Sequence, residues 1–323
     1  MNVGIWVTNG VDALKRVDTA LLRNLGFGGV FVACYEDEVR WRVDDVASFV
    51  RRAKADGLDP FAVPYGYGRF LDPDPLIESL YVQTHPDACQ TDSRGRRLRK
   101  ACPNNPQFLE WFSSSVRTLA WLLECTGFLW DQPGFHYARG QWSCRCGYCA
   151  RLFRAGYGHE MPRELTDEVI QFRCNSVTMF TLAAAAAIES VDRRLTSLVM
   201  PSPHLSSGQH LTGNEDVQRL ASCAGVSGLC VMVPWQELGW DMEHALREAA
   251  EGPARVTHAC DGVCAVGVNC SPRPEDRTIE TIQFAARLGI DAMVMADYTT
   301  LIESPAFPLI REPLAEALHA ASS

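Results

Sequence analysis

Residues 29–35 read Gly-Val-Phe-Val-Ala-Cys-Tyr, and residues 292–296 read Ala-Met-Val-Met-Ala. Neither run alternates apolar with polar residues, which is typical of strands that are buried on both faces in a parallel sheet. Eight short runs of this kind, bounded by turn residues, occur along the chain. We expect strands at Val3–Thr8, Gly29–Tyr35, Pro60–Tyr65, Gly127–Asp131, Ser197–Pro201, Gly228–Trp235, Ala254–Cys260 and Ala292–Asp297.

Helical patterns lie between these runs. They cover Val11–Leu25, Val43–Asp56, Gln107–Glu124, Thr166–Ser190, Asn214–Ala224, Met242–Glu251 and Pro274–Leu288. The clearest start signal is Asn105 as N-cap with Pro106 at the first helical position. Eight strands alternating with helices predict an α/β protein with a (β/α)8 TIM barrel. A doubly wound open sheet is the alternative, but no G-x-G-x-x-G motif follows the first strand.

Two connections are longer than one helix requires. Residues 66–126 separate the third and fourth expected strands, and residues 132–196 separate the fourth and fifth. The surplus precedes the helix in both cases, so we expect long loops after strands 3 and 4 at the carboxy-terminal end of the barrel, where active sites of this fold lie. No repeat or low-complexity linker interrupts the chain, and we expect a single domain over residues 1–323.

The composition limits the class of partner. The 323 residues include 30 Lys and Arg against 39 Asp and Glu, a net charge of −9, with 47% apolar residues. This balance is ordinary for a globular protein and argues against binding to nucleic acid or to an anionic membrane. Because no apolar run is long enough to span a bilayer and no export signal opens the sequence, we expect a cytoplasmic protein, with a homo-oligomer possible.

Cys144-Arg-Cys146-Gly-Tyr-Cys149 forms a C-x-C-x2-C run without an apolar pattern that would bury it. Clustered thiolates suit a tetrahedral soft-metal site, usually zinc, although a redox role is the alternative. Cys102 is the best fourth ligand, with Cys89, His85 and His136 also available. Four protein ligands would close the shell and make the zinc structural within a loop region spanning residues 85–160, whereas an open position would indicate a zinc-dependent transferase.

Several of these residues together resemble a known family. Cys102-Pro-Asn-Asn-Pro106 before a helix, Trp130-Asp-Gln-Pro133 at the end of a strand, and then the C-x-C-x2-C run are similar to the catalytic barrel of family 42 β-galactosidases and related zinc-stapled barrels. These are clan A glycoside hydrolases. The resemblance covers residues 100–155 in motifs and implies a zinc site made by Cys102, Cys144, Cys146 and Cys149. It also places the catalytic acid at position 132.

The chain departs from that pattern at both catalytic positions. The strand-4 acid position holds Gln132, next to Asp131, and an amide has no proton to donate to a leaving oxygen. The sequence leaves open whether Gln132 is the natural residue or a replaced glutamate. The expected seventh strand contains no glutamate, so Asp261 is the nearest carboxylate, with His258 beside it. Glu36 and Asp297 are alternative second carboxylates.

Polar and aromatic residues gather at the expected strand ends. Flat rings and hydrogen-bonding groups suit a sugar ligand. The candidate substrate-binding residues are Trp6, Tyr35, Glu36, Tyr65, Trp130, His136, His204, Trp235, His258 and Asp297. A basic run, Arg94-Gly-Arg-Arg-Leu-Arg-Lys100, follows the third strand and is either a solvated loop face or a surface that attracts an anionic substrate.

The first expectation for function is hydrolysis of a glycosidic bond in a small carbohydrate or glycoside. An acid at position 132 would protonate the leaving oxygen, a second carboxylate such as Asp261 would stabilise or attack the anomeric carbon, and Asp131 would orient the substrate. Two alternatives stay open: a zinc-dependent transferase, and a carbohydrate-binding pseudoenzyme that retains Gln132.

Overall fold

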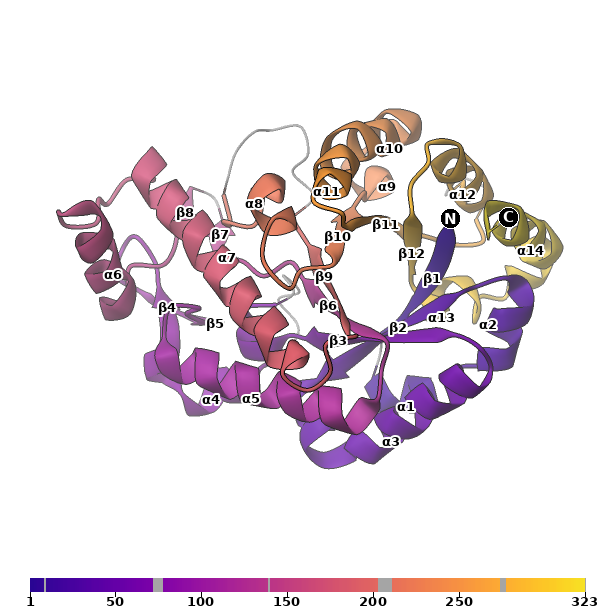
Figure 1. Cartoon of the computed structure of the whole chain (residues 1–323), viewed down its shortest axis with the longest axis horizontal. Helices are drawn as coiled ribbons and strands as arrows, with labels where there is room; N and C mark the ends of the chain where they lie inside the picture. The colour runs from indigo at the N-terminus through magenta and orange to yellow at the C-terminus, as the bar shows by residue number, and fades with distance from the viewer. Residues whose placement is uncertain (9, 72–77, 139, 203–210, 274–276, 323) are drawn as a thin grey trace.

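A computed structural model describes residues 1–8, 10–71, 78–138, 140–202, 211–273 and 277–322. Eight parallel strands form a closed barrel in the order β1-β12-β11-β10-β9-β6-β3-β2, and helices surround it (Figure 1). The (β/α)8 prediction is therefore confirmed. The barrel strands are β1 (Asn2–Val7), β2 (Gly29–Tyr35), β3 (Asp59–Tyr65), β6 (Gly127–Asp131), β9 (Thr196–Met200), β10 (Gly228–Met232), β11 (Val263–Asn269) and β12 (Ala292–Ala296).

Helices cover the outside of the barrel. The longer ones are α3 (Glu36–Ala55), α5 (Pro106–Leu123), α7 (Asp167–Glu189), α10 (Met242–Ala249), α12 (Thr278–Arg287) and α14 (Phe307–Ser322). Shorter helices are α1 (Gly10–Leu14), α2 (Thr19–Leu25), α8 (Val217–Ala221), α9 (Trp235–Leu238), α11 (Arg255–Ala259) and α13 (Tyr298–Leu301). The predicted start of α5 is confirmed, since the Asn105 side chain accepts hydrogen bonds from the backbone N–H groups of Gln107 and Phe108. No helix within the described ranges has the length and apolar character that a membrane span requires.

The segments after β3 and β6 carry small elements of their own. Between β3 and α5 lie a 3-10 turn (Tyr67–Arg69), α4 (Leu80–Thr84), a second 3-10 turn (Pro86–Ala88), and the antiparallel pair β4 (Cys89–Thr91) and β5 (Arg97–Ala101). Between β6 and α7 lie the pair β7 (Tyr137–Ala138) and β8 (Gln141–Trp142), followed by α6 (Gly147–Tyr157). These elements gather on one side of the barrel, at the left of Figure 1.

The seventh strand was predicted at the wrong place. Residues 254–260 are helical, because the π-helix Ala250–Ala254 continues into α11, and the strand is Val263–Asn269. Asp261 therefore precedes the strand, at the amino-terminal end of the barrel. His258 lies at the same end, where its Nε2 is 2.6 Å from Asp291 Oδ2. Both residues are thus remote from the carboxy-terminal ends of the strands.

The barrel has an inner and an outer apolar cluster, as expected for strands buried on both faces. The inner one is formed by Trp6, Phe31, Val63, Leu129, Leu198, Met200, Cys230, Ala265 and Val294. Val266 and Met293, which alternate with these positions, belong to the outer cluster shared with the helices. The side chains of every second residue therefore point into the barrel, and at the carboxy-terminal ends they reach its mouth.

The corrected position of β11 predicts a specific clash. Gly228 pairs with Val263 at the start of β11, and a Cβ on Gly228 would overlap the Val263 carbonyl group. We expect Gly228→Ala to lower the free energy of unfolding by about 1–3 kcal/mol. The measurement is denaturant unfolding. The control is Gly252→Ala, whose Cβ would contact nothing within 4 Å and which should be neutral or slightly stabilising. Equal stability of the two variants would contradict this strand register.

Candidate functional site

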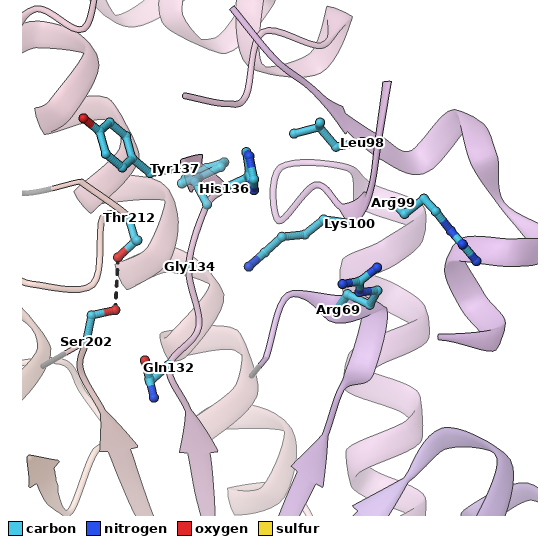
Figure 2. Close-up of a pocket in the computed structure, with 11 residues that line it drawn as sticks. Arg69, Leu98, Arg99, Lys100, Gln132, Gly134, His136, Tyr137, Ser202 and Thr212 are labelled. Carbon is cyan, nitrogen blue, oxygen red and sulfur yellow. Dashed lines mark hydrogen bonds between the residues drawn. The ribbon is translucent and has the colours of Figure 1, made fainter. Parts of the chain in front are cut away.

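A cavity of about 380 Å³ opens beside the carboxy-terminal end of β6. Its walls come from four segments: the end of β6, the turn after β3, strand β5, and the segment after β9 (Figure 2). The lining residues are Arg69, Leu98, Arg99, Lys100, Gln132, Gly134, Phe135, His136, Tyr137, Ser202 and Thr212. Of the predicted site residues, Gln132 and His136 meet in this cavity.

Gln132 has an unusual backbone conformation. Its φ is 42°, and its N–H donates to the Met200 carbonyl at 3.0 Å. Few residues other than glycine adopt positive φ, and the proline at position 133 further disfavours it. Arg69, in the same cavity, has φ 51°. Backbone strain of this kind, costing roughly 1–3 kcal/mol per residue, is often found where a side chain must be aimed at a ligand.

Asp131 and Trp130 point in opposite directions. Asp131 is 3% exposed and follows Leu129 of the inner cluster by two residues, so it faces the barrel interior. Trp130 faces the helices: its Nε1 donates to Ser197 Oγ at 2.8 Å, and its ring lies 6.0 Å from that of Phe112 in α5. Trp130 therefore lies in the core between barrel and helix and does not line the cavity, in contrast to its predicted position in the substrate site.

Three predicted aromatic residues meet at the mouth of the barrel. The rings of Trp6 and Tyr65 lie 6.3 Å apart, and those of Tyr35 and Tyr65 lie 5.3 Å apart, both edge to face. Asp297, at the end of β12, accepts hydrogen bonds from Thr8 Oγ1 and from the Thr300 N–H. These residues share the carboxy-terminal end of the barrel with Gln132 but do not line its cavity.

The Glu36 carboxylate holds the segment after β3. It accepts hydrogen bonds from the Gly68 N–H and Ser79 Oγ, both at 2.7 Å, and from the Tyr81 N–H at 2.9 Å. Burial raises the pKa of this carboxyl group, although these hydrogen bonds oppose the shift. These hydrogen bonds from its own chain mean that Glu36 positions the loop, and it does not line the cavity beside Gln132.

The remaining predicted residues differ in position. His136 lies in the cavity wall, and its backbone N–H donates hydrogen bonds to Gln90 Oε1 and Ser143 Oγ, both at 3.1 Å. Burial lowers the pKa of its imidazole. Trp235 is 8% exposed, packs in the outer core and does not line the cavity. His204 lies outside the described residues.

Three further polar residues near the strand ends, Arg69, Thr212 and Asn269, were not among the candidates predicted from the sequence. Arg69 ends a Gly-Tyr-Gly-Arg turn directly after β3, where a polar side chain would have been a signal. Asn269 is the last residue of β11 and was overlooked because the seventh strand was misplaced. Gln132 therefore follows the end of β6, and Asn269 is the last residue of β11. In the clan A enzymes that the sequence resembles, these two strands carry the catalytic glutamates, whereas both residues here are amides.

The predicted cysteine cluster forms. The sulfur atoms of Cys102, Cys144, Cys146 and Cys149 all lie within 4.8 Å of one another. Cys102 Sγ is 3.4 Å from Cys149 Sγ and 3.6 Å from Cys146 Sγ. The corners of a tetrahedron with Zn–S bonds near 2.3 Å are about 3.8 Å apart, so the spacing fits a metal ion.

Hydrogen bonds around the cluster also suit thiolate ligands. The N–H groups of Thr91 and Cys146 point at Cys144 Sγ, each at 3.4 Å, and the side-chain amide of Asn104 donates to Cys149 Sγ at 3.3 Å. Such second-shell donors orient and stabilise metal-bound sulfur. Cys89, the alternative ligand, lies outside the four-cysteine cluster. The residues present could therefore hold a metal ion with no further protein ligand.

Comparison with known proteins supports the fold. No protein-family model matches the sequence, and no curated protein matches it either. Among solved structures, a β-galactosidase from Halorubrum lacusprofundi superposes with a TM-score of 0.73 at 14% identity, covering 100% of this chain and 58% of that one. A GH42 β-galactosidase from G. stearothermophilus gives 0.71 at 10% identity, covering 99% and 57%.

An endo-β-1,4-mannanase from Thermotoga petrophila is also similar, with a TM-score of 0.59 at 11% identity, covering 100% of this chain and 77% of that one. The chain spans 56–60% of the length of the β-galactosidases it matches. At these identities the likeness concerns the fold. The chain shares the (β/α)8 barrel fold of these enzymes, as the sequence resemblance implied.

The cysteine cluster makes a prediction about metal content. Replacing one thiolate of a closed four-sulfur site weakens metal binding, and the metal's contribution to folding is lost with it. We expect Cys146→Ser to lower both the metal content of the purified protein and its Tm. Metal analysis and thermal unfolding measure the two effects.

Cys260→Ser provides the matched control, because Cys260 is also partly exposed but lies outside the cluster. It should leave metal content and Tm unchanged. A Cys146→Ser protein that keeps its full metal content would refute the site.

Proposed function

We propose that the carboxy-terminal end of this barrel binds a carbohydrate and that the chain is a glycoside-hydrolase-like barrel with little hydrolytic activity as it stands. The glycoside hydrolase fold supports carbohydrate as the ligand class. So do the cluster of Trp6, Tyr35 and Tyr65 and the neighbouring polar cavity, since sugar rings stack on aromatic faces while their hydroxyls require hydrogen-bonding partners.

The low hydrolytic activity is proposed because amides stand at the ends of both β6 and β11. Glycoside hydrolysis in this clan requires two carboxyl groups, one as acid/base and one as nucleophile. Gln132 and Asn269 stand at those strand ends. Either amide can donate and accept hydrogen bonds, but neither can transfer a proton or form a glycosyl ester. This favours the carbohydrate-binding alternative.

The hydrolase alternative depends on other carboxylates at the same end. Asp131 faces the barrel interior beside Gln132, and Asp297 lies at the end of β12. Asp131 would then be the acid and Asp297 the second carboxylate. The hydrogen bonds from Thr8 and Thr300 to Asp297 make it a weaker nucleophile, because they stabilise its charge.

A structural zinc ion fits the proposal. Held by Cys102, Cys144, Cys146 and Cys149, it would crosslink the segments that carry two walls of the cavity. Cys102 follows Lys100 by two residues, and Cys144 follows β8, which pairs with Tyr137 in β7. Four thiolates leave no open position for a substrate, which argues against a zinc-dependent transferase. Cytoplasmic location and homo-oligomer formation stay predictions.

Replacing the amides tests the proposal. We expect the chain as given to bind lactose without hydrolysing it, and Gln132→Glu/Asn269→Glu to hydrolyse lactose measurably. General acid catalysis typically contributes about 10²–10⁴-fold, so the double variant should exceed Asn269→Glu alone by at least about 10²-fold. Restoring the acid should matter less for 4-nitrophenyl β-galactoside, whose leaving group needs no proton. The measurement is product release from both substrates.

The control is Gln141→Glu, the same chemical change in β8 outside the cavity. It should have no effect on either substrate. Hydrolysis of a natural glycoside by the unmodified chain at about 1–10³ s⁻¹ would contradict the pseudoenzyme proposal and support the Asp131 alternative.

A further inference from the structure

The cavity beside Gln132 is lined by positive charge. Arg69, Arg99, Lys100 and His136 are among its lining residues, and none of the described lining residues is Asp or Glu. This contrasts with the net charge of −9 of the whole chain. The cationic side chains come from the turn after β3 and from β5, and His136 adds an imidazole from the segment after β6, so folding gathers these groups from three parts of the sequence.

Lys100 is the member that reaches the centre. Figure 2 shows its side chain extending from β5 towards the segment that begins at Gln132, whereas the side chain of Arg99 points away from it. Arg99 forms an ion pair with Glu78, and Arg97 one with Asp87 at 2.9 Å. Within the basic run, the side chains of Arg97 and Arg99 form ion pairs, whereas the side chain of Lys100 extends into the cavity.

A buried arginine lies behind the cavity wall. Arg173, in α7, has no exposed surface, stacks over the ring of the lining residue Phe135 at 5.3 Å, and donates from Nη2 to the His136 carbonyl at 3.2 Å. It forms no ion pair with any described residue. Burial lowers its pKa to about 10, so it remains a cation at neutral pH.

Three acidic groups of the neighbouring described segments are held by other residues. Glu78 pairs with Arg99, and Asp92 pairs with Arg96 at 2.8 Å. Glu215 accepts hydrogen bonds from the N–H groups of Thr212 and Gly213. After burial, the largest influences on His136 are the charges of Lys100 and Arg173, which lower the pKa of its imidazole further. Arg69 acts in the same direction and Asp92 in the opposite one, so cationic charges dominate around this wall of the cavity.

We propose that this cavity recognises an acidic carbohydrate, a sugar carrying a carboxylate or a sulfate ester, whose negative group contacts Lys100 and Arg69. Charge-assisted hydrogen bonds from an ammonium and a guanidinium group are the usual means of holding such an anion. Gln132, Ser202 and Thr212 supply hydrogen bonds for the neighbouring hydroxyls. The proposal deepens the proposed function and rests on it, because it names the class of sugar bound at that site.

Calorimetric titration of the full chain tests the inference. The probes are D-galactose, D-galacturonate, galactose 6-sulfate and sodium sulfate, at low and at high salt. We expect at least one acidic sugar to bind about tenfold more tightly than galactose, with a smaller advantage at high salt. The tighter of the two acidic sugars identifies the carboxylate or the sulfate ester as the recognised group.

Variants locate the effect. Lys100→Gln should reduce the preference for the acidic sugar over galactose by about tenfold, and Lys100→Arg should retain the preference. Arg97→Gln is the matched control from the same strand and should behave like the unmodified chain, because Arg97 does not line the cavity. Unchanged metal content and Tm in Lys100→Gln would exclude a folding defect.

Each other outcome overturns a defined statement. Equal affinity for galactose and for both acidic sugars would overturn the inference but leave carbohydrate binding intact. Absence of binding by every sugar would overturn the proposed function and, with it, this inference. Sodium sulfate binding as tightly as galactose 6-sulfate would assign the cavity to a free oxyanion and also overturn the inference.

Discussion

The hydrogen bonds between β1 and β12 close the sheet, and the other features described above depend on this closure. Asn2 to Ile5 pair with Ala292 to Met295 in parallel register, so the first and last strands of the barrel become neighbours. Since all eight strands are parallel, their carboxy ends meet at one end of the cylinder. Residues as far apart in sequence as Thr8 and Asp297 are thereby brought into contact.

The cavity is built beside that end by two long excursions, and four sulfur atoms connect them. Cys102 comes from the excursion after β3, whereas Cys144, Cys146 and Cys149 come from the one after β6. Apolar residues of both excursions, among them Phe70, Tyr81, Phe135 and Trp142, pack in the outer core, and a metal crosslink would add a further constraint. The cysteine cluster lies outside the cavity, whose polar lining residues include Gln132, Lys100 and Arg69.

The chemistry of the site differs from that of the hydrolase barrels it resembles in shape. Gln132 follows the last residue of β6, Asn269 is the last residue of β11, and the charged residues among the described lining of the cavity are basic. An amide at either strand end carries no negative charge and has no proton to transfer. In the proposed function, such a site would hold a negatively charged sugar without cleaving it.

The sequence by itself determined the barrel and the cysteine cluster, because both are encoded in local patterns: runs of apolar residues at strand length, and a C-x-C-x2-C spacing. The same periodicity could have placed Trp130 on the outer face, since only one of Trp130 and Asp131 can face the barrel interior. The seventh strand was misassigned because short runs containing Val256 and Thr257 are compatible with either helix or strand when judged locally. Only the tertiary structure decided that Asp261 and His258 lie at the opposite end of the barrel. It also decided that the Glu36 carboxylate accepts hydrogen bonds from the loop after β3, and that the charges of Arg69, Lys100 and Arg173 all act on His136. Such properties depend on distances between segments that are remote in the chain, and no local pattern of residues contains them.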